Sequence, residues 1–285
     1  MRPKIGGHVS AAGGLYKCFD NAKKIGAECI QIFGASPRAW RTKTISKDEA
    51  EKFKQTAKEA NFELSGVYLH ASYLVNLANV NEENRQLSIG NLTDHLRIAD
   101  SIGAHGLIFH LGSSGEEPDK NIALQKTVSA MQAVLKAVPG KACLIMENSA
   151  GGGNKLGFRF SEIGEILKKV GSNRVKVCLD TAHIFAAGGI EEYTPENIKA
   201  MFDEFEKEIG LENLVALHIN DSKTLFNSHH DRHENLGEGH IGLEGFKNLA
   251  KEKRLWDKDW ILEVPGFDNE GPDLKNMEIL RSLFV

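Results

Sequence analysis

The chain has 285 residues, of which 26% are charged, and a formal net charge of -4 at pH 7. This length allows two modest domains or one large α/β barrel, because such barrels run to about 250 residues as one unit. The slight acidity does not favour a nucleic-acid binder, since proteins that neutralise phosphates usually carry a basic excess. That exclusion fails if bound metal ions supply the positive charge.

The cysteines and the apolar segments indicate an intracellular setting. Cys18, Cys29, Cys143 and Cys178 are scattered and form no C-x-x-C pair, which favours buried, reduced thiols over disulfides. The first residues, MRPKIGGHVSAAGG, lack the apolar core of a signal peptide, and no stretch is long enough to span a membrane. We therefore expect a cytoplasmic protein with no membrane partner.

Short apolar runs alternate with segments of helical spacing along the chain. The runs predict strands at 4–9, 28–33, 66–71, 106–112, 142–148, 175–180, 214–221 and 259–264. Their nearly continuous apolar character is typical of parallel strands covered on both faces. Helices are predicted at 47–61, 83–102, 121–138, 161–169, 195–209 and 243–253. Ser46 and Thr194 resemble helix N-caps, and Gly26 and Gly103 resemble helix ends.

Strand-then-helix units without a linker rich in Pro, Gly or Ser predict a single (β/α)8 TIM barrel over residues 1–285. An open, doubly wound sheet is the alternative. The even distribution of the units and a helix after the last strand favour the closed barrel. In such barrels the active site lies at the carboxyl ends of the strands.

Side chains that can bind metals end six consecutive predicted strands. They are His70, His110, Glu147, Asp180, His218 and Glu263. Each also has a structural interpretation, such as a hydrogen-bonded core histidine for His110 or half of an ion pair for Glu147. The set favours metal binding, because strand ends converge on one mouth and buried polar groups need partners.

The stretch SHHDRHENLGEGHIG, residues 228–242, adds a second candidate group. Asp231 and His233 form a D-x-H pair, a spacing that lets both side chains face the same way on an extended segment. With His183 from LDTAHIFAAG they make a three-ligand group that leaves one coordination position open. The other histidines of this stretch receive no metal role, and its GEG turn is interpreted as a close approach of the backbone near the mouth.

The Asp180-Thr181 pair allows a further structural interpretation. Either residue could be the N-cap of a helix that follows the strand, and we favour Thr181 over Asp180 because Asp180 lies at a strand end.

Longer motifs resemble those of the endonuclease IV family, the class II apurinic/apyrimidinic endonucleases. They are VYLHASYLVNLAN, LIFHLGS, LIMENSAGGGNKLG, CLDTAHIFAAG, LHINDSKTLFNSHHDRHENLGEGHIG and ILEVPG. The similarity runs from GGHVSAAGG near the start to the last strand and covers nearly the whole chain. Motifs of this length and order are highly specific.

The resemblance implies three zinc ions (Zn²⁺) on the carboxyl face of the barrel. The first would be held by His70, His110 and Glu147, the second by Glu147 as a bridge with Asp180, His218 and Glu263, and the third by His183, Asp231 and His233. Imidazoles among the ligands favour zinc, with manganese (Mn²⁺) as an alternative at some positions. Ala71 and Ala182 stand where family members often carry Asp and Cys, and neither would coordinate metal.

The resemblance also implies a zinc-dependent deoxyribonuclease IV that cleaves the phosphodiester 5′ to an abasic site. The products would be a 3′-hydroxyl and a 5′-deoxyribose phosphate, with trimming of blocked 3′ ends as a side activity. A hydroxide between the first two zincs would attack phosphorus, and Glu147 would be the catalytic residue that orients or deprotonates it. The expected partner is duplex DNA with abasic sites or blocked 3′ ends, bound by a monomer.

Loop residues are candidates for DNA contact. By resemblance Arg38, Tyr73 and Leu74 would enter the minor groove and wedge the stack apart. Loop packing is the alternative for Tyr73 and Leu74, and it is the favoured interpretation for Trp40. Lys155 and Lys223 could contact phosphates, although a surface lysine is usually only solvated.

Two rival functions remain open at this stage. Metal-dependent sugar isomerases share much of this architecture, but we would expect from them a mostly carboxylate two-metal site and a catalytic Lys. A noncatalytic protein that binds damaged DNA would keep the fold without nicking the strand, and the complete set of candidate ligands disfavours it.

Overall fold

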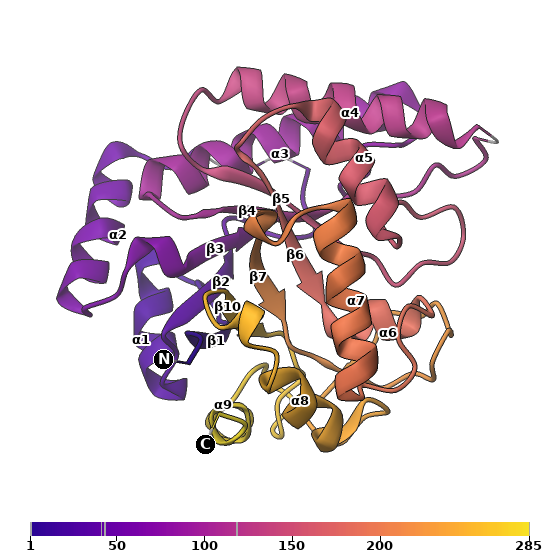
Figure 1. The fold of residues 1–285 in the computed structure, drawn as a ribbon. Coiled ribbons are helices and arrows are strands. Elements are labelled where there is room, and N and C mark those ends of the chain that lie inside the picture. The colour runs from indigo at the N-terminus through magenta and orange to yellow at the C-terminus, as the bar shows by residue number, and fades with distance from the viewer. Residues whose placement is uncertain (1, 41, 43, 118, 285) are drawn as a thin grey trace.

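The computed structural model describes residues 2–40, 42, 44–117 and 119–284. In these residues, parallel strands form one closed barrel in the order β1-β10-β7-β6-β5-β4-β3-β2 (Figure 1). The strands are β1 Ile5–His8, β2 Cys29–Phe33, β3 Val67–His70, β4 Gly106–His110, β5 Cys143–Glu147, β6 Val175–Asp180, β7 Leu214–His218 and β10 Asp259–Leu262. The pairing of β1 with β10 closes the barrel, which confirms the predicted TIM barrel and excludes the open sheet.

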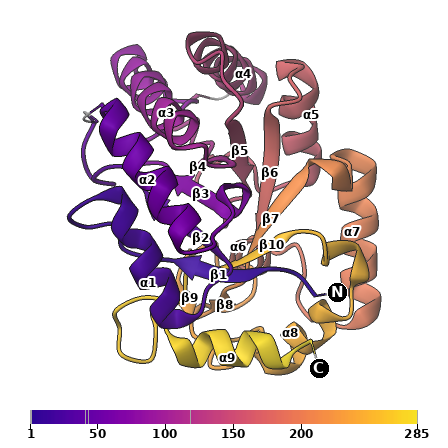
Figure 2. The same ribbon diagram turned by 90° about the vertical axis from the view of Figure 1, so that its left-hand side faces the viewer.

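The helices form an outer layer around the strands (Figures 1 and 2). They are α1 Cys18–Ile25, α2 Lys47–Glu59, α3 Glu82–Ile102, α4 Lys120–Ala137, α5 Phe160–Val170, α6 Thr181–Ala186, α7 Pro195–Glu208, α8 Gly242–Ala250 and α9 Leu274–Ser282. The six predicted helices are confirmed with small shifts at their ends. The largest shift is at α8, because the chain turns into a short 3-10 helix at Lys253–Leu255.

Helix ends follow the sequence signals. The Ser46 hydroxyl accepts from the Glu49 backbone N–H and the Glu49 carboxylate accepts from the Ser46 N–H, which completes a capping box. The Thr194 side chain caps α7, whose first residue is Pro195. Gly26 ends α1 with φ 66°, a left-handed conformation that glycine adopts without steric cost.

The predicted strand at 214–221 was wrong in its second half. The barrel strand β7 ends at His218, and Asp221–Ser222 forms β8, which pairs antiparallel with β9, His233–Glu234. The apolar run continued through Ile219 because this residue is also buried. Its backbone N–H donates to the Ile261 carbonyl, near the carboxyl end of β10, before the chain leaves the barrel.

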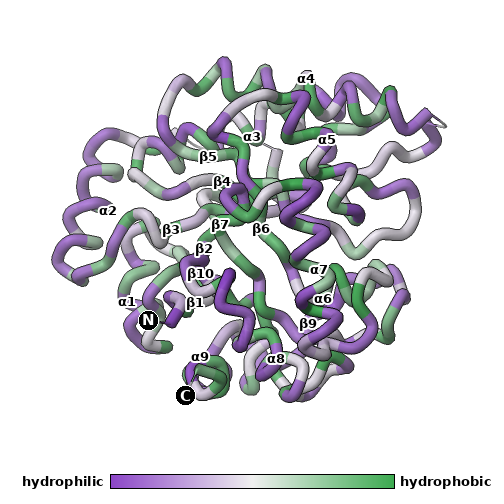
Figure 3. The backbone as a smooth tube through the Cα atoms, in the orientation of Figure 1, coloured by the Kyte–Doolittle hydropathy of each residue, from purple (hydrophilic) through white to green (hydrophobic). Residues whose placement is uncertain are grey.

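A small apolar cluster fills the inside of the barrel. Its fully buried members are Cys29, Tyr68, Ile108, Ile145, Cys178, Ala216 and Ile261, one from each of β2, β3, β4, β5, β6, β7 and β10. A larger apolar layer lies between strands and helices, and the hydropathy of the chain is highest along the central strands (Figure 3). All four cysteines are free; Cys18, Cys29 and Cys178 are buried as predicted, whereas Cys143 is half-buried.

No helix within the described residues combines the length and the hydropathy needed to cross a bilayer.

The amino-terminal end of the barrel contains a half-buried carboxyl group, that of Asp259 at the start of β10. The Tyr68 hydroxyl donates to Oδ2 of Asp259 at 2.8 Å. Burial raises the pKa of Asp259 from its ordinary value of 3.8 to about 6, although the Tyr68 hydrogen bond acts in the opposite direction. The unfolded chain therefore ionises this group at lower pH than the folded protein, and the fold loses stability as pH rises through this range.

We expect Asp259→Asn to stabilise the fold at pH 7.5 by about 2 to 3 kcal/mol, because no carboxylate then has to ionise in this partly desolvated position. The amide oxygen can still accept from Tyr68. Below about pH 4 the gain should vanish, because the aspartate is then protonated in both states. Urea unfolding of both proteins at the two pH values measures the difference, and an equal gain at both would contradict the interpretation.

Candidate metal centre and active site

Inside the barrel, a polar layer lies next to the apolar cluster, on the side of the carboxyl ends of the strands. Side chains two residues apart on a strand point to the same side, so each inward apolar residue is followed two positions later by an inward polar one. The polar layer consists of His8, Gln31, His70, His110, Glu147, Asp180, His218 and Glu263. In the strand register His110 lies beside Glu147 and Asp180 beside His218. Glu263 lies one residue beyond the end of β10.

Glu147 occupies the centre of this layer. Its Oε2 lies 3.1 Å from Nε2 of His70 and 3.6 Å from Nε2 of His110. Its Oε1 lies 3.0 Å from Nδ1 of His218 and 3.2 Å from Nδ1 of His183. The two oxygens of one carboxylate therefore face two different sets of imidazoles, which is the geometry that a bridging ligand requires.

The second set is completed by two more carboxylates. Nδ1 of His218 lies 3.2 Å from Oε2 of Glu263 and 3.8 Å from Oδ2 of Asp180. The side chains of His218 and Asp180 are fully buried. The His218 nitrogen and the carboxylate oxygens of Glu147, Asp180 and Glu263 thus converge on one small volume.

The third set joins α6 to the loop before β9. Oδ2 of Asp231 lies 3.1 Å from Nε2 of His183, and its Oδ1 lies 3.3 Å from Nε2 of His233. Both Nε2 atoms are buried and lack a hydrogen-bond partner of good geometry. Buried polar atoms are rarely left in this state, so these two nitrogens fit a missing ligand such as a metal ion.

Three groups among the described residues have ligand atoms within 4.8 Å of one another. Two are the groups expected from sequence: His70, His110 and Glu147, and Glu147, Asp180, His218 and Glu263. The third contains Asp180, His183 and His233. Asp231 contacts this group through two different oxygens, one toward each histidine, so the expected trio is also brought together.

The electrostatics of the centre are dominated by mutual neutralisation. Burial alone would raise the pKa of Glu147, but the imidazoles of His110 and His218 hold it well below its usual value. Burial would lower the pKa of His183, but the carboxylates of Asp180 and Asp231 raise it well above the usual value. The Glu147 carboxylate is therefore ionised and available as a ligand.

Backbone carbonyls orient two of the histidines. Nδ1 of His70 donates to the Ala71 carbonyl at 2.9 Å, and Nδ1 of His183 donates to the Asn148 carbonyl at 2.9 Å. In the neutral imidazole this leaves the lone pair on Nε2, the atom that faces the centre. The alanine at position 71 therefore still provides an orienting group, through its backbone.

The N-cap of α6 is Asp180, and the preference for Thr181 was wrong. Oδ1 of Asp180 accepts from the His183 backbone N–H at 2.8 Å. The Thr181 hydroxyl instead donates to the Asn220 carbonyl at 2.7 Å. Because β6 runs directly into α6, one carboxylate can cap the helix through Oδ1 and face the metal centre through Oδ2.

The loop at 228–242 is organised by Asp221. Its Oδ2 accepts from the N–H groups of Gly237 and Gly239 at 3.0 and 3.1 Å, and its Oδ1 accepts from Ile241 at 2.9 Å. A Cβ at position 239 would lie 2.5 Å from Oδ1 of Asp221. The close backbone approach predicted for the GEG turn is therefore present.

His229 packs against the glycine-rich segment 151–153, which follows β5. A Cβ at Gly152 would lie 2.7 Å from the Cβ of His229, so the two loops pack closely. Nothing places His229, His230 or His240 in the three groups.

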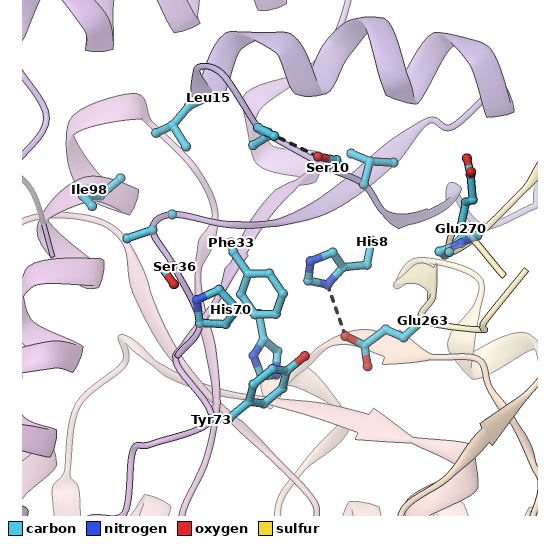
Figure 4. Close-up of a pocket in the computed structure, with 18 of the residues that line it drawn as sticks. His8, Ser10, Leu15, Phe33, Ser36, His70, Tyr73, Ile98, Glu263 and Glu270 are labelled. Atoms are coloured by element: carbon cyan, nitrogen blue, oxygen red, sulfur yellow. Dashed lines mark hydrogen bonds and ion pairs between the residues drawn. The ribbon is translucent and has the colours of Figure 1, made fainter. Parts of the chain in front are cut away.

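A cavity of about 1110 Å³ opens at the carboxyl end of the barrel and is lined by residues of the polar layer. Figure 4 shows His8, His70 and Glu263 lining it together with Phe33 and Tyr73. The lining also includes His110, His183, Asp231 and His233. Members of all three groups are therefore reachable from one opening.

The predicted DNA-contacting residues lie on two loops at this opening. Tyr73 is 65% exposed and Leu74 36% exposed, which disfavours the loop-packing interpretation for Tyr73. Arg38 is exposed on the preceding loop. The Tyr73 backbone N–H donates to the Pro37 carbonyl at 3.1 Å, so the two loops are joined.

The three remaining residues considered from the sequence are one half-buried tryptophan, Trp40, and two exposed lysines, Lys155 and Lys223. Trp40 is half-buried beside α3, where the Asn91 amide donates to its carbonyl at 2.9 Å, in accordance with packing. Lys155 and Lys223 are exposed. Lys223 lies 3.6 Å from a carboxylate oxygen of Glu234, and nothing in the structure marks either lysine as a phosphate ligand.

Sequence reasoning missed four polar residues of the centre. Asn148 and Asn220 bracket Asp180: the Asn148 amide oxygen accepts from the Asp180 backbone N–H, and the Asn220 amide donates to its Oδ2. His8 and Gln31 complete the polar layer. Gln31 had a readable signal, because it interrupts the apolar residues 29–33 of the run ECIQIF.

Comparisons with known proteins agree with this architecture. A family model described as xylose isomerase-like TIM barrel matches residues 19–283. A D-tagatose 3-epimerase-like protein has the same fold, with a TM-score of 0.73 and 18% identity over 98% of this chain and 96% of its own. The chain is a xylose isomerase-like TIM barrel protein.

More similar proteins narrow the family. A probable endonuclease 4 of Halothermothrix orenii is 36% identical over 98% of this chain and 99% of its own. The crystal structure of endonuclease IV from Thermus thermophilus has a TM-score of 0.85 and 31% identity, covering 99% of this chain and 98% of that one. The chain belongs to the endonuclease 4 family, as its motifs indicated.

We expect Asp221→Asn to destabilise the fold by about 2 to 4 kcal/mol, because the new amide N–H₂ group faces backbone donors and cannot accept from them. Thermal or urea unfolding measures this loss. The matched control is Glu238→Gln in the same turn, whose side chain is exposed and whose substitution should change little. Equal stability of the two variants would show that Asp221 does not organise the loop.

Proposed function

We propose that this protein is a zinc-dependent endonuclease that hydrolyses the phosphodiester 5′ to abasic sites in duplex DNA, leaving a 3′-hydroxyl and a 5′-deoxyribose phosphate. The observation that carries the proposal is the central position of Glu147, whose two oxygens face two different ligand groups. Membership of the endonuclease 4 family supports the nuclease activity and the DNA substrate.

The donor set fits zinc. Five imidazoles and four carboxylates take part in the proposed groups, and calcium or magnesium would favour a shell of oxygens only. We assign three ions: one to His70, His110 and Glu147, one to Glu147, Asp180, His218 and Glu263, and one to His183, Asp231 and His233. Manganese is an alternative at some positions. When bound, such ions supply an activated water and stabilise negative charge on a phosphate.

The residues around the centre hold the ligands in place before DNA binds. The carbonyls of Ala71 and Asn148 fix two imidazoles, and Asn220 fixes the Asp180 carboxylate. Glu147 is 1% exposed, so its carboxylate is shielded from bulk water and its interactions with charge are strengthened. We assign Glu147 the role of bridging ligand and of orienting group for the attacking water.

Charge at the mouth also fits a DNA substrate. Three zinc ions bring six positive charges, whereas the proposed ligands include four carboxylates, so the loaded centre is positive although the chain is slightly acidic. The same centre can receive the phosphodiester at a blocked 3′ end, and we propose 3′-end trimming as a side activity.

The sugar-isomerase alternative receives little support from the cavity. The similarity to the epimerase-like protein extends to the fold alone. Among the described residues that line the cavity there is no lysine, whereas sugar chemistry of that kind was expected to use one. The centre is also rich in imidazoles, unlike a mostly carboxylate site.

The direct test incubates zinc-loaded protein with a duplex that carries one tetrahydrofuran abasic analogue. We expect incision on the 5′ side, and Glu147→Gln should lower the rate by about 100-fold to 1000-fold or more, because the amide cannot bridge two ions. DNA binding by the variant should be nearly unchanged, since loops supply most contacts. Gel analysis of products and a binding assay separate the two effects.

Absence of 5′ incision by the loaded wild-type protein would refute the activity. Tight binding of the abasic duplex without nicking would favour the noncatalytic alternative, and turnover of an aldose would favour the isomerase. Unchanged turnover in Glu147→Gln would remove Glu147 from the bridge.

We also expect Tyr73→Ala to weaken binding of the abasic duplex by about 10-fold, or about 1.4 kcal/mol, because an exposed ring at the mouth no longer fills the gap in the base stack. Binding to an undamaged duplex should change less. Ile122→Ala on the outer helix α4 is the control, since Ile122 is also exposed. An equal effect on damaged and undamaged DNA would contradict a wedge role for Tyr73.

A further inference from the structure

Gln31 and His8 are the two polar residues of the inner layer that the proposed metal groups leave without a role, and Gln31 is the one that contacts two of the proposed ligands by hydrogen bonds of good geometry. Gln31 lies on β2, is fully buried, and is paired in the register with His8 on β1. Its neighbours along the strand, Ile30 and Ile32, are apolar and buried. A buried amide in such a strand is costly unless all its hydrogen bonds are made.

The Gln31 amide makes those bonds inside the metal centre. Its Oε1 accepts from Nε2 of His218 at 2.8 Å. Its Nε2 donates to Oε1 of Glu263 and lies 2.9 Å from Nδ1 of His8, which itself lies 3.4 Å from the same Glu263 oxygen. One side chain from β2 thus reaches His218, the last residue of β7, and Glu263, the residue after β10, although β1 lies between β2 and β10 in the barrel (Figure 4 shows His8 and Glu263 here).

The orientation of the amide follows from the partners. A carboxylate oxygen can only accept, so the N–H₂ group of Gln31 must face Glu263 and the carbonyl oxygen must face His218. A carbonyl oxygen in turn requires a hydrogen on Nε2 of His218. In the neutral imidazole the lone pair then lies on Nδ1.

That lone pair is directed at the second metal group. Nδ1 of His218 lies 3.0 Å from Oε1 of Glu147 and 3.2 Å from Oε2 of Glu263. The Glu263 oxygen held by Gln31 is the other one, Oε1. Gln31 therefore contacts the outward atom of each ligand and leaves the atom facing the centre free.

We propose that Gln31 is a positioning residue for the second metal ion, fixing the tautomer of His218 and the rotation of the Glu263 carboxylate with one amide. The inference rests on the proposed function, since it assumes that this group binds metal. Groups that orient metal ligands in this way commonly change metal affinity by about 10-fold to 100-fold when they are removed.

The test compares zinc content and zinc affinity of wild type and Gln31→Met, a substitution of similar length without hydrogen bonds. Competition with a chromophoric chelator should show that the variant binds two of the three ions with wild-type affinity and the third about 10-fold to 100-fold more weakly. Cobalt substitution gives an independent readout, because reorientation of one histidine and one carboxylate should alter the visible spectrum of the site. Incision should lose kcat with little change in KM for DNA.

One control and one second variant of Gln31 keep the test decisive. Thr127→Val removes a buried hydroxyl of α4 whose hydrogen bond goes to the Ala123 carbonyl, and it should leave zinc affinity unchanged. Gln31→Glu keeps the shape and the acceptor for His218 but lacks the donor to Glu263, so it should also weaken the binding of one ion. It replaces Gln31→Met if that variant does not fold.

The outcomes separate this inference from the proposed function. If wild type binds no zinc, the proposed function fails and the inference fails with it. If wild type binds three ions and incises DNA while folded Gln31→Met or Gln31→Glu holds all three with wild-type affinity, Gln31 is not a positioning residue. An equal weakening in Thr127→Val would also overturn the inference, because the loss would then reflect general destabilisation.

Discussion

The structure depends on the accommodation of one buried carboxylate. Glu147 is 1% exposed and would be strongly destabilising in an apolar barrel without partners. Imidazoles on both sides lower its pKa well below the usual value against the effect of burial. The imidazoles that contact Glu147 come from β3, β4, α6 and β7, so neutralising this single charge couples elements spread over most of the chain. Removal of Glu147 would leave several buried imidazoles without their common partner.

The barrel makes this arrangement possible through the alternation of its strands. Inward positions form an apolar layer with residues such as Tyr68 and Ile145, and the next inward positions form the polar layer. The strands supply rigid positions, whereas His183 and the segment with Asp231 and His233 come from the elements beyond them. Asp221 fixes the turn that follows this segment, because its carboxylate accepts from the backbone N–H groups of Gly237 and Ile241. A centre of this kind therefore combines strand ends with one organised loop, and the same fold can serve other chemistry when these residues differ.

Much of this could be predicted from the sequence, because local patterns carried the information. Continuous apolar runs marked the barrel strands, and polar residues at their ends marked the candidate ligands. The double role of Asp180, as helix cap and as part of the centre, could not be read locally, because it depends on β6 running directly into α6. Gln31 was passed over for a similar reason: its partners are 187 and 232 residues away in sequence, so its function becomes visible only in the closed barrel.

The central claim is that Glu147 bridges two metal ions in a three-ion centre. Diffraction from crystals of the purified protein, recorded on both sides of the zinc absorption edge, tests it most directly. We predict three anomalous peaks at the carboxyl end of the barrel, two of them separated by about 3.5 to 4 Å, with one Glu147 oxygen on each. Absence of zinc peaks, or peaks that Glu147 does not contact, would contradict the account.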